Sequence, residues 1–233
     1  MSFKVSVIIP CYNCSKWIIR CLDSIPSRDD IEIICVNDGS SDNTEDILNN
    51  YNGSRWAKFS VISQENQGPG KSRDVGIEAA EGIYICLIDA DDYIFPEVFN
   101  DVVDTYLVGD IIKPRHETDS LEIYWPRIMR GAFIKSSLAK RFKHPHDRMI
   151  GEDTEYRKEI EKINPRILYL NEVMYHYFNF NLDSVSHKLK KTPKSEPKKN
   201  TNSNKRVKVK PKNNDYFDGF NQNMVQNEFV RFK

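Results

Sequence analysis

Short apolar runs alternate with amphipathic segments through the first part of the chain. The runs lie at 5–9, 31–36, 59–62 and 83–88 and are rich in Val and Ile. Runs of this length predict strands that are buried on both faces. Apolar residues recur at helical spacing in the segments between them, and strands that alternate with helices are typical of parallel sheets. The pattern therefore predicts an α/β fold with a mostly parallel, doubly wound sheet and helices on both faces.

The pattern is less regular beyond residue 96. Pro96 suits the first turn of a helix, a second helix is expected at 136–142, and aromatic residues gather at 169–180. Apolar side chains keep recurring as far as residue 187. We therefore expect one folded domain over 1–187, with a boundary between its two halves near residue 96.

The composition changes after His187. Residues 188–214 contain eleven Lys or Arg and one acid, so their net charge is +10 (11 − 1) and the rest of this neutral chain carries −10. A segment with so few apolar side chains cannot fold alone, and we expect a disordered basic linker. Residues 215–233 regain apolar content, which indicates a C-terminal segment that docks onto the domain or begins another one.

The basic segment bears on possible partners. Each Lys or Arg near an anionic membrane contributes about 1 kcal/mol of attraction, so weak association with anionic membranes is one expectation. A plain flexible linker is the alternative. Nucleic acid is a poor candidate, because residues 188–214 contain no aromatic side chain that could stack on a base.

The cysteines and the hydropathy pattern bear on location. The five cysteines do not show the spacing of a disulfide framework, which favours reduced thiols. No secretory signal precedes the first strand, and no apolar run approaches the roughly 18 residues of a membrane span. We expect a cytoplasmic protein, with any peripheral membrane contact at the cytoplasmic face.

Carboxylates follow the predicted strands. Asp89, Asp91 and Asp92 come directly after the fourth apolar run, Asp38 follows the second, and Asp153 lies in a later acidic motif. Ligands of open α/β sheets bind beyond the carboxyl ends of the strands. Neighbouring carboxylates repel one another, and a hard divalent cation with oxygen ligands would balance them. A solvated acidic loop that caps the next helix is the alternative.

Longer motifs around these acids resemble the inverting glycosyltransferase family 2. The matching blocks occur in the family's order and spacing, at 5–13 (VSVIIPCYN), 36–44 (VNDGSSDNT), 66–68 (NQG), 72–76 (SRDVG), 82–92 (GIYICLIDADD) and 152–153 (ED). The resemblance covers about 3–187 and is dense through residue 96. It implies the GT-A fold, with a nucleotide-binding half at 1–96 and an acceptor half at 97–187.

The same resemblance implies an activity. A family member moves a sugar from a nucleotide diphosphate donor to an acceptor hydroxyl, as in glycan or polysaccharide synthesis. A UDP-sugar is the expected donor, and Mn²⁺ or Mg²⁺ is the expected cofactor. The acceptor would be a hydroxyl of a glycan, a lipid-linked molecule or a protein.

The resemblance also assigns roles to residues. It implies a nucleotide site at Pro10, Tyr12, Asp38, Arg73 and Asp89, in which Asp38 would bind the base, Asp89 the ribose, and Arg73 would pair with Asp38 or the nucleotide. Asp91 would ligate the metal with Asp92 in support, and His187 is a further candidate ligand. An acceptor hydroxyl is a poor nucleophile and needs a base. That base would be Asp153, with Glu152 as its support or its competitor.

The chain departs from the family pattern at several positions. Asn37 stands where an acid is usual, Ser72 and Asp74 replace a common Ala and Asn, and Phe178 replaces an Arg that often contacts the diphosphate. The last change puts one phosphate contact in doubt.

Two other functions remain open on the sequence. A nucleotidyltransferase of related architecture would be expected to have a Gly-rich loop with a basic residue after the first strand, where this chain has 10–13 (PCYN). A non-catalytic module that binds sugar nucleotides is the second alternative, and the acids Asp91 and Asp153 argue against it.

Overall fold

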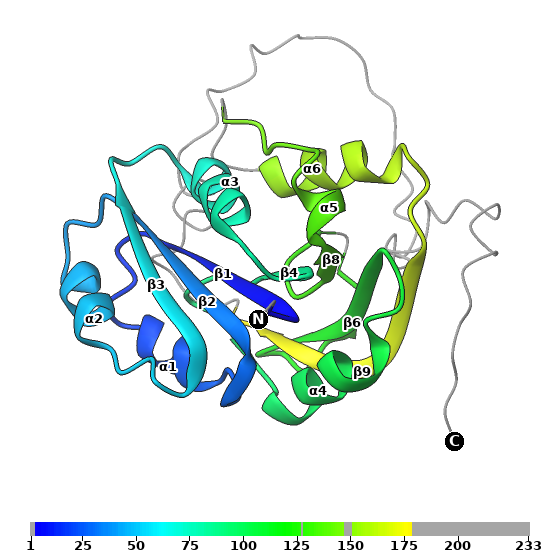
Figure 1. The fold of residues 1–233 in the computed structure, drawn as a ribbon, viewed down its shortest axis with the longest axis horizontal. Coiled ribbons are helices and arrows are strands. Elements are labelled where there is room, and N and C mark those ends of the chain that lie inside the picture. The colour runs from blue at the N-terminus through cyan, green and yellow to red at the C-terminus, as the bar shows by residue number, and fades with distance from the viewer. Residues whose placement is uncertain (1–2, 127, 147–150, 179–233) are drawn as a thin grey trace, which may run out of the picture.

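The computed structural model describes residues 3–126, 128–146 and 151–178 (Figure 1). A nine-stranded sheet runs in the order β3-β2-β1-β4-β8-β6-β9-β5, with β7 paired to β6. The strands are β1 (Val5–Cys11), β2 (Arg28–Asp38), β3 (Trp56–Gln64), β4 (Tyr84–Leu87), β5 (Tyr93–Ile94), β6 (Ile111–Thr118), β7 (Ile123–Tyr124), β8 (Phe133–Lys135) and β9 (Ile167–Tyr177). The helices are α1 (Ile18–Asp23), α2 (Thr44–Asn50), α3 (Pro69–Ala79), α4 (Pro96–Asp101), which continues as a π-helical turn at Val102–Tyr106, α5 (Ser136–Ala139) and α6 (Glu152–Glu161).

The four predicted apolar runs form a continuous parallel part of the sheet, made of β1 to β4. Strand β1 pairs in parallel with both β2 and β4, and β2 pairs in parallel with β3. Side chains alternate between the two faces of each strand. In β2, for example, Ile33 packs in the core below α1 and α2, whereas Ile34 packs in the core with α3. This arrangement agrees with the predicted α/β class.

Helices cover both faces of the sheet (Figure 1). One apolar core joins the sheet to α1, α2 and α4, and the other joins it to α3, α5 and α6. The second half is mixed rather than parallel, since β8 runs antiparallel to β4 and β6, while β9 pairs in parallel with β6. The strands of the second half therefore extend the parallel sheet and place β9 near the end of β4.

Several local predictions differ from the structure. The first strand extends beyond the apolar run at 5–9, through Pro10 to Cys11. The helix expected at 136–142 is confined to Ser136–Ala139.

All five cysteines are free and buried. None of the helices in the described part of the chain is long and apolar enough to cross a membrane, and 188–214 and 215–233 lie outside the described residues.

Candidate active site

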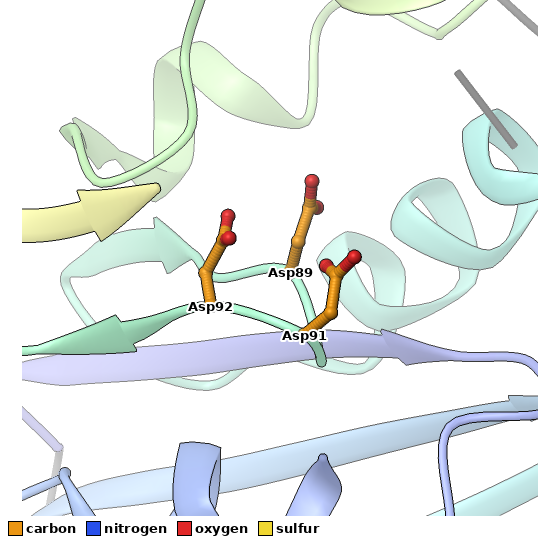
Figure 2. Close-up of side chains that lie close together, drawn as sticks. All are labelled: Asp89, Asp91 and Asp92. Atoms are coloured by element: carbon orange, nitrogen blue, oxygen red, sulfur yellow. The ribbon is translucent and has the colours of Figure 1, made fainter. Parts of the chain in front are cut away.

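Three carboxylates project from the loop between β4 and β5. The loop closes on itself, because the Asp92 N–H donates to the Asp89 carbonyl at 3.1 Å. Asp89, Asp91 and Asp92 each offer a carboxylate oxygen within 4.8 Å of the others, and the three side chains extend to the same side of the loop (Figure 2). An all-oxygen donor set at this spacing fits a hard cation such as Mg²⁺ or Mn²⁺.

Asp92 is the buried member of this group. Its Oδ2 accepts a hydrogen bond from the Tyr175 hydroxyl at 2.6 Å, and its Oδ1 accepts one from the Phe178 N–H at 2.8 Å. Burial, together with the negative charge of Asp91, raises the pKa of Asp92 well above its ordinary value. A bound cation would offset both effects.

Asp89 is held by two arginines. Its Oδ1 lies 2.8 Å from Nη2 of Arg73, and its Oδ2 lies 2.5 Å from Nη1 of Arg130. Burial opposes ionisation, but the charges of Arg130 and Arg73 prevail and lower the pKa of Asp89 to about 2. Asp89 is therefore a carboxylate at neutral pH, and its two arginines come from different halves of the chain.

The loop between β4 and β5, which we call the acidic loop, is also contacted by α1. This helix packs on the face of the sheet opposite to α3 and α6. Nη2 of Arg20 donates to the Asp91 carbonyl at 2.6 Å. The Arg20 guanidinium also lies over the rings of Trp17, Tyr93 and Phe178, at 5.5, 5.2 and 4.7 Å from their centroids. Phe178, which stands where the family often has an Arg, thus packs against the Arg20 guanidinium. That guanidinium in turn binds the backbone of Asp91, the predicted metal ligand.

Arg73 links the acidic loop to the later acidic motif. Its Nη1 lies 2.8 Å from Oε1 of Glu152 and 3.2 Å from Oδ1 of Asp153. Gly151 precedes α6 with a φ of +86°, a conformation that glycine adopts without strain. That turn directs the first two residues of α6 toward α3. The motif at 152–153 and the strand end at Asp89 therefore share one buried arginine, although 79 residues separate Arg73 from Glu152.

Asp38 occupies a separate position at the end of β2. Its Oδ1 accepts from the Gln67 N–H at 2.9 Å and from Nε2 of Gln64 at 2.7 Å, and its Oδ2 accepts from the Gly68 N–H at 2.8 Å. Arg73 was expected to pair with Asp38 or with the nucleotide. In the structure its carboxylate partners are Asp89, Glu152 and Asp153. Asp38 is thus fixed by backbone and amide donors.

The loops after β1 and β2 are joined by Asn13. This residue has a φ of 48°, and its Oδ1 accepts from the Ser41 N–H at 2.8 Å. Beside it, Pro10 pairs with Val36 across the two strands, and the Tyr12 side chain is 48% exposed. An exposed aromatic ring at this edge is available to stack on a planar ligand.

The structure brings most of the predicted residues to the same edge of the sheet. Arg73 joins Asp89, Glu152 and Asp153, and Asp91 and Asp92 adjoin Asp89. His187 lies outside the described residues.

Sequence reasoning missed Arg130 and the role of Tyr175. Arg130 reaches Asp89 because it pairs with Leu87 in an isolated parallel bridge, a contact between distant segments that no local motif indicates. Tyr175 belongs to an aromatic segment that the sequence did single out. Its hydroxyl also accepts from the Asp89 N–H at 3.1 Å, which connects two residues of the acidic loop.

Comparisons with known proteins agree with this geometry. The family model for glycosyl transferase family 2 matches residues 6–178. A Bacillus subtilis protein named "Putative glycosyltransferase EpsH" is 47% identical over 95 residues, which cover 40% of this chain and 27% of EpsH. The chain therefore spans about a quarter of the length of that relative.

Solved structures confirm the predicted GT-A fold class. The structure of Staphylococcus aureus TarS 1–349 in complex with UDP-GlcNAc superposes with a TM-score of 0.66 at 23% identity, over 76% of this chain and 59% of TarS. A mannosyltransferase from Pyrobaculum calidifontis, in complex with GDP-Man and Mn²⁺, gives a TM-score of 0.60 at 18% identity, over 76% of this chain and 57% of the other. Because the family model covers residues 6–178 and the carboxylates of its motifs meet at one edge of the sheet, the chain belongs to glycosyl transferase family 2.

Proposed function

We propose that this chain carries the catalytic domain of a metal-dependent, inverting glycosyltransferase. It would move a sugar from a nucleoside diphosphate donor, preferably a uridine nucleotide, to an acceptor hydroxyl. One observation carries the proposal: Arg73 binds both Asp89, which lies in the three-carboxylate group, and Asp153. A group that could hold a cation therefore lies next to a carboxylate that could act as a base.

The nucleoside would bind at the edge formed by β1 and β2. Tyr12 would stack on the base, and Pro10 would border it. A carboxylate has about four lone-pair sites, and three hydrogen bonds to Asp38 are present, so one further donor such as the uracil N–H can be accommodated. Asp89 would accept from the ribose hydroxyls while Arg73 and Arg130 hold its orientation. GDP-Man in the mannosyltransferase and UDP-GlcNAc in TarS make both nucleotides worth testing.

The diphosphate would lie over the acidic loop. Asp91 would ligate Mn²⁺ or Mg²⁺, and Asp92, held by Tyr175 and the Phe178 N–H, would orient the site. When bound, the cation would offset the negative charge that develops on the departing diphosphate. Arg20 lies beside Asp91 and adds a positive charge near the same place.

The chemistry would be a single in-line displacement. As the acceptor oxygen bonds to the anomeric carbon, its proton passes to Asp153, and the bond from that carbon to the diphosphate breaks. Glu152 lies closer to Arg73 than Asp153 does, at 2.8 Å against 3.2 Å, so we assign the supporting role to Glu152. One displacement inverts the anomeric configuration.

Transfer assays with single variants test the proposal. Asp153→Asn should lower turnover by about 100- to 10,000-fold, as expected for loss of a general base, and leave donor binding intact. Asp91→Asn should weaken the Mn²⁺-dependent thermal shift produced by UDP-sugars. Glu159→Gln, an exposed position on the same helix as Asp153, is the matched control.

Three results would contradict the proposal. Tight donor binding without turnover on any acceptor would favour a non-catalytic module. Release of pyrophosphate would indicate nucleotidyl transfer. A product that retains the anomeric configuration of the donor would exclude the single displacement.

The acceptor and the setting of the reaction are also proposals. A glycan, a lipid-linked molecule or a protein would supply the hydroxyl. The net charge of +10 over 188–214 would favour a cytoplasmic protein that associates with anionic membranes and meets a lipid-linked acceptor there. Vesicle sedimentation with and without 188–233, at low and high salt, tests this, and unchanged binding after truncation would contradict it.

A further inference from the structure

A buried polar group lies behind Asp153 and is not used in the mechanism above. It consists of Asp74 on α3 and of His144 and His146, which follow α5. The His144 side chain has no exposed surface, and its ring stacks on Tyr156 of α6 with centroids 3.9 Å apart. Gly70 permits this approach, because a Cβ there would lie 3.1 Å from Cβ of His144 and 3.0 Å from the Pro145 carbonyl.

Asp74 fixes the orientation of the His144 ring. Its Oδ1 lies 2.7 Å from Nδ1 of His144, and both of its oxygens accept from the His144 N–H at 3.2 Å. Although burial opposes ionisation, the hydrogen bonds from His144 and His146 lower the pKa of Asp74. Because an ionised carboxylate only accepts, Nδ1 of His144 must carry the proton that it donates.

The other ring nitrogen of His144 faces Asp153. Nε2 is buried, has no hydrogen-bond partner among the described residues, and lies 3.8 Å from Oδ1 of Asp153. In a neutral ring with its proton on Nδ1, Nε2 is an acceptor. It would gain a hydrogen bond at the moment when Asp153 becomes protonated, and distances between catalytic groups commonly shorten in the reactive complex.

The group continues to the surface. Oδ2 of Asp74 lies 2.8 Å from Nε2 of His146, whose side chain is 43% exposed. Asp153, His144, Asp74 and His146 therefore form a continuous series from the candidate base to solvent.

We propose that His144 is a positioning residue that receives the proton from Asp153 after transfer. The inference rests on the proposed role of Asp153 as the base. The acceptor O–H bond breaks and its proton binds Asp153. The new Asp153 O–H bond then breaks as a bond from that proton to Nε2 of His144 forms. Asp74 stabilises the resulting imidazolium. After the products leave, the proton on Nε2 returns through Asp153 to water in the emptied site, which restores the Nδ1–H tautomer of His144 and the carboxylate of Asp153.

The surrounding charges are compatible with this path. Arg73 lies 3.2 Å from Oδ1 of Asp153 and Arg130 lies 3.8 Å from Oδ2, while Glu152 is paired with Arg73. The Tyr156 hydroxyl donates to the Ala139 carbonyl and does not compete for His144. The guanidinium groups of Arg73 and Arg130 also bind Asp89, and Nε2 of His144 is the acceptor that faces Asp153.

Two measurements on the full chain test the proposal. Long-range ¹H–¹⁵N NMR should show His144 protonated at Nδ1, with His116, a second buried histidine that stacks on Tyr175, as the internal reference. In Asp74→Asn the amide can donate to Nδ1, which should move the proton to Nε2. A proton on Nε2 in the unaltered chain would overturn the proposal.

Kinetics supply the second measurement. Asp74→Asn and His144→Gln should each lower kcat for transfer by about 10- to 100-fold with the donor KM unchanged, and His144→Ala should be partly rescued by added imidazole. A merely structural histidine would not respond to imidazole. If the parent chain transfers sugar and kcat is unaltered in both Asp74→Asn and His144→Gln, the proposed proton transfer from Asp153 to His144 is wrong, whereas the proposed function is not affected. A parent chain that transfers no sugar would overturn the proposed function first, and the two failures are thus distinguishable.

Discussion

Two arginine-centred clusters join the first half of the molecule to the second, at opposite edges of the sheet. At the carboxyl edge, Arg73 and Arg130 bind Asp89, Glu152 and Asp153. We call this the inner cluster. At the amino end of β2, Arg28 binds Asp30 at 2.8 Å and Asp104 at 2.7 Å, with Lys4 beside the same two acids. This is the outer cluster.

Both clusters pair arginines with carboxylates, but their side chains differ in how far they are exposed to solvent. The Arg73 side chain is 4% exposed, whereas those of Arg28, Asp30 and Asp104 are 13%, 24% and 54% exposed. Moving charges out of water costs free energy, and a buried pair recovers that cost only with good geometry and full pairing. An exposed pair loses little hydration free energy and gains little free energy from its attraction. The inner cluster is therefore costly to disturb, while the outer one is a more exposed contact between β2 and the turn after α4.

The largest expected effect comes from removing the shared cation of the inner cluster. Arg73→Met leaves the buried Glu152 without its arginine and takes one of two arginines from both Asp89 and Asp153. Breaking a buried pair in this way should lower the free energy of unfolding by about 3–5 kcal/mol. Urea denaturation measures the change, and the effect should depend little on added salt. A loss below about 1 kcal/mol, the range of exposed pairs, would show that the inner cluster is solvated in solution.

A smaller effect is expected from a neutral member of the same site. Tyr175→Phe removes the donor to Oδ2 of Asp92 and the acceptor for the Asp89 N–H. Leaving buried polar atoms unpaired should cost about 1–3 kcal/mol. Tyr51→Phe is the matched control, since its hydroxyl donates to Asp23 at an exposed position. Urea denaturation of the two variants should rank Tyr175→Phe as the more destabilised, and the reverse order would contradict the comparison.

The sequence predicted the inner cluster only in part, and for a physical reason. Parallel strands bring their carboxyl ends to one edge, so Asp38 and Asp89 could be placed there from local patterns. The later acidic motif drew attention to Glu152, but Arg73 was expected to pair with Asp38 or the nucleotide and not with Glu152. Arg130 could not be placed there, because its approach depends on the bridge to Leu87 and on Gly131, whose φ of +66° suits a residue without a side chain.

The contact of Asp74 and His144 behind Asp153 could not be predicted from the sequence for a similar reason. Asp74 stood out as a departure from the family pattern, but its partner His144 lies 70 residues away in an irregular segment. Regular elements follow from local periodicity, whereas side chains on connecting segments are positioned by contacts between distant parts of the chain. The first half was accordingly predicted closely, and the second half was predicted by its motifs rather than by its strands.

The smallest effect is expected in the outer cluster, where it should depend on pH and salt. Arg28→Met should cost under about 1 kcal/mol, as exposed pairs do. Hydrogen bonding to Arg28 lowers the pKa of Asp30 from its ordinary 3.8 to about 2. A group whose pKa is lower in the folded state stabilises the fold above its ordinary pKa, and this contribution is lost as the pH falls through the folded value. Urea denaturation should therefore show a difference between the parent chain and Arg28→Met near neutral pH that shrinks as the pH falls from about 3.8 toward about 2 and that also shrinks in added salt. A difference as large as that of Arg73→Met and insensitive to salt would remove the distinction between the two clusters.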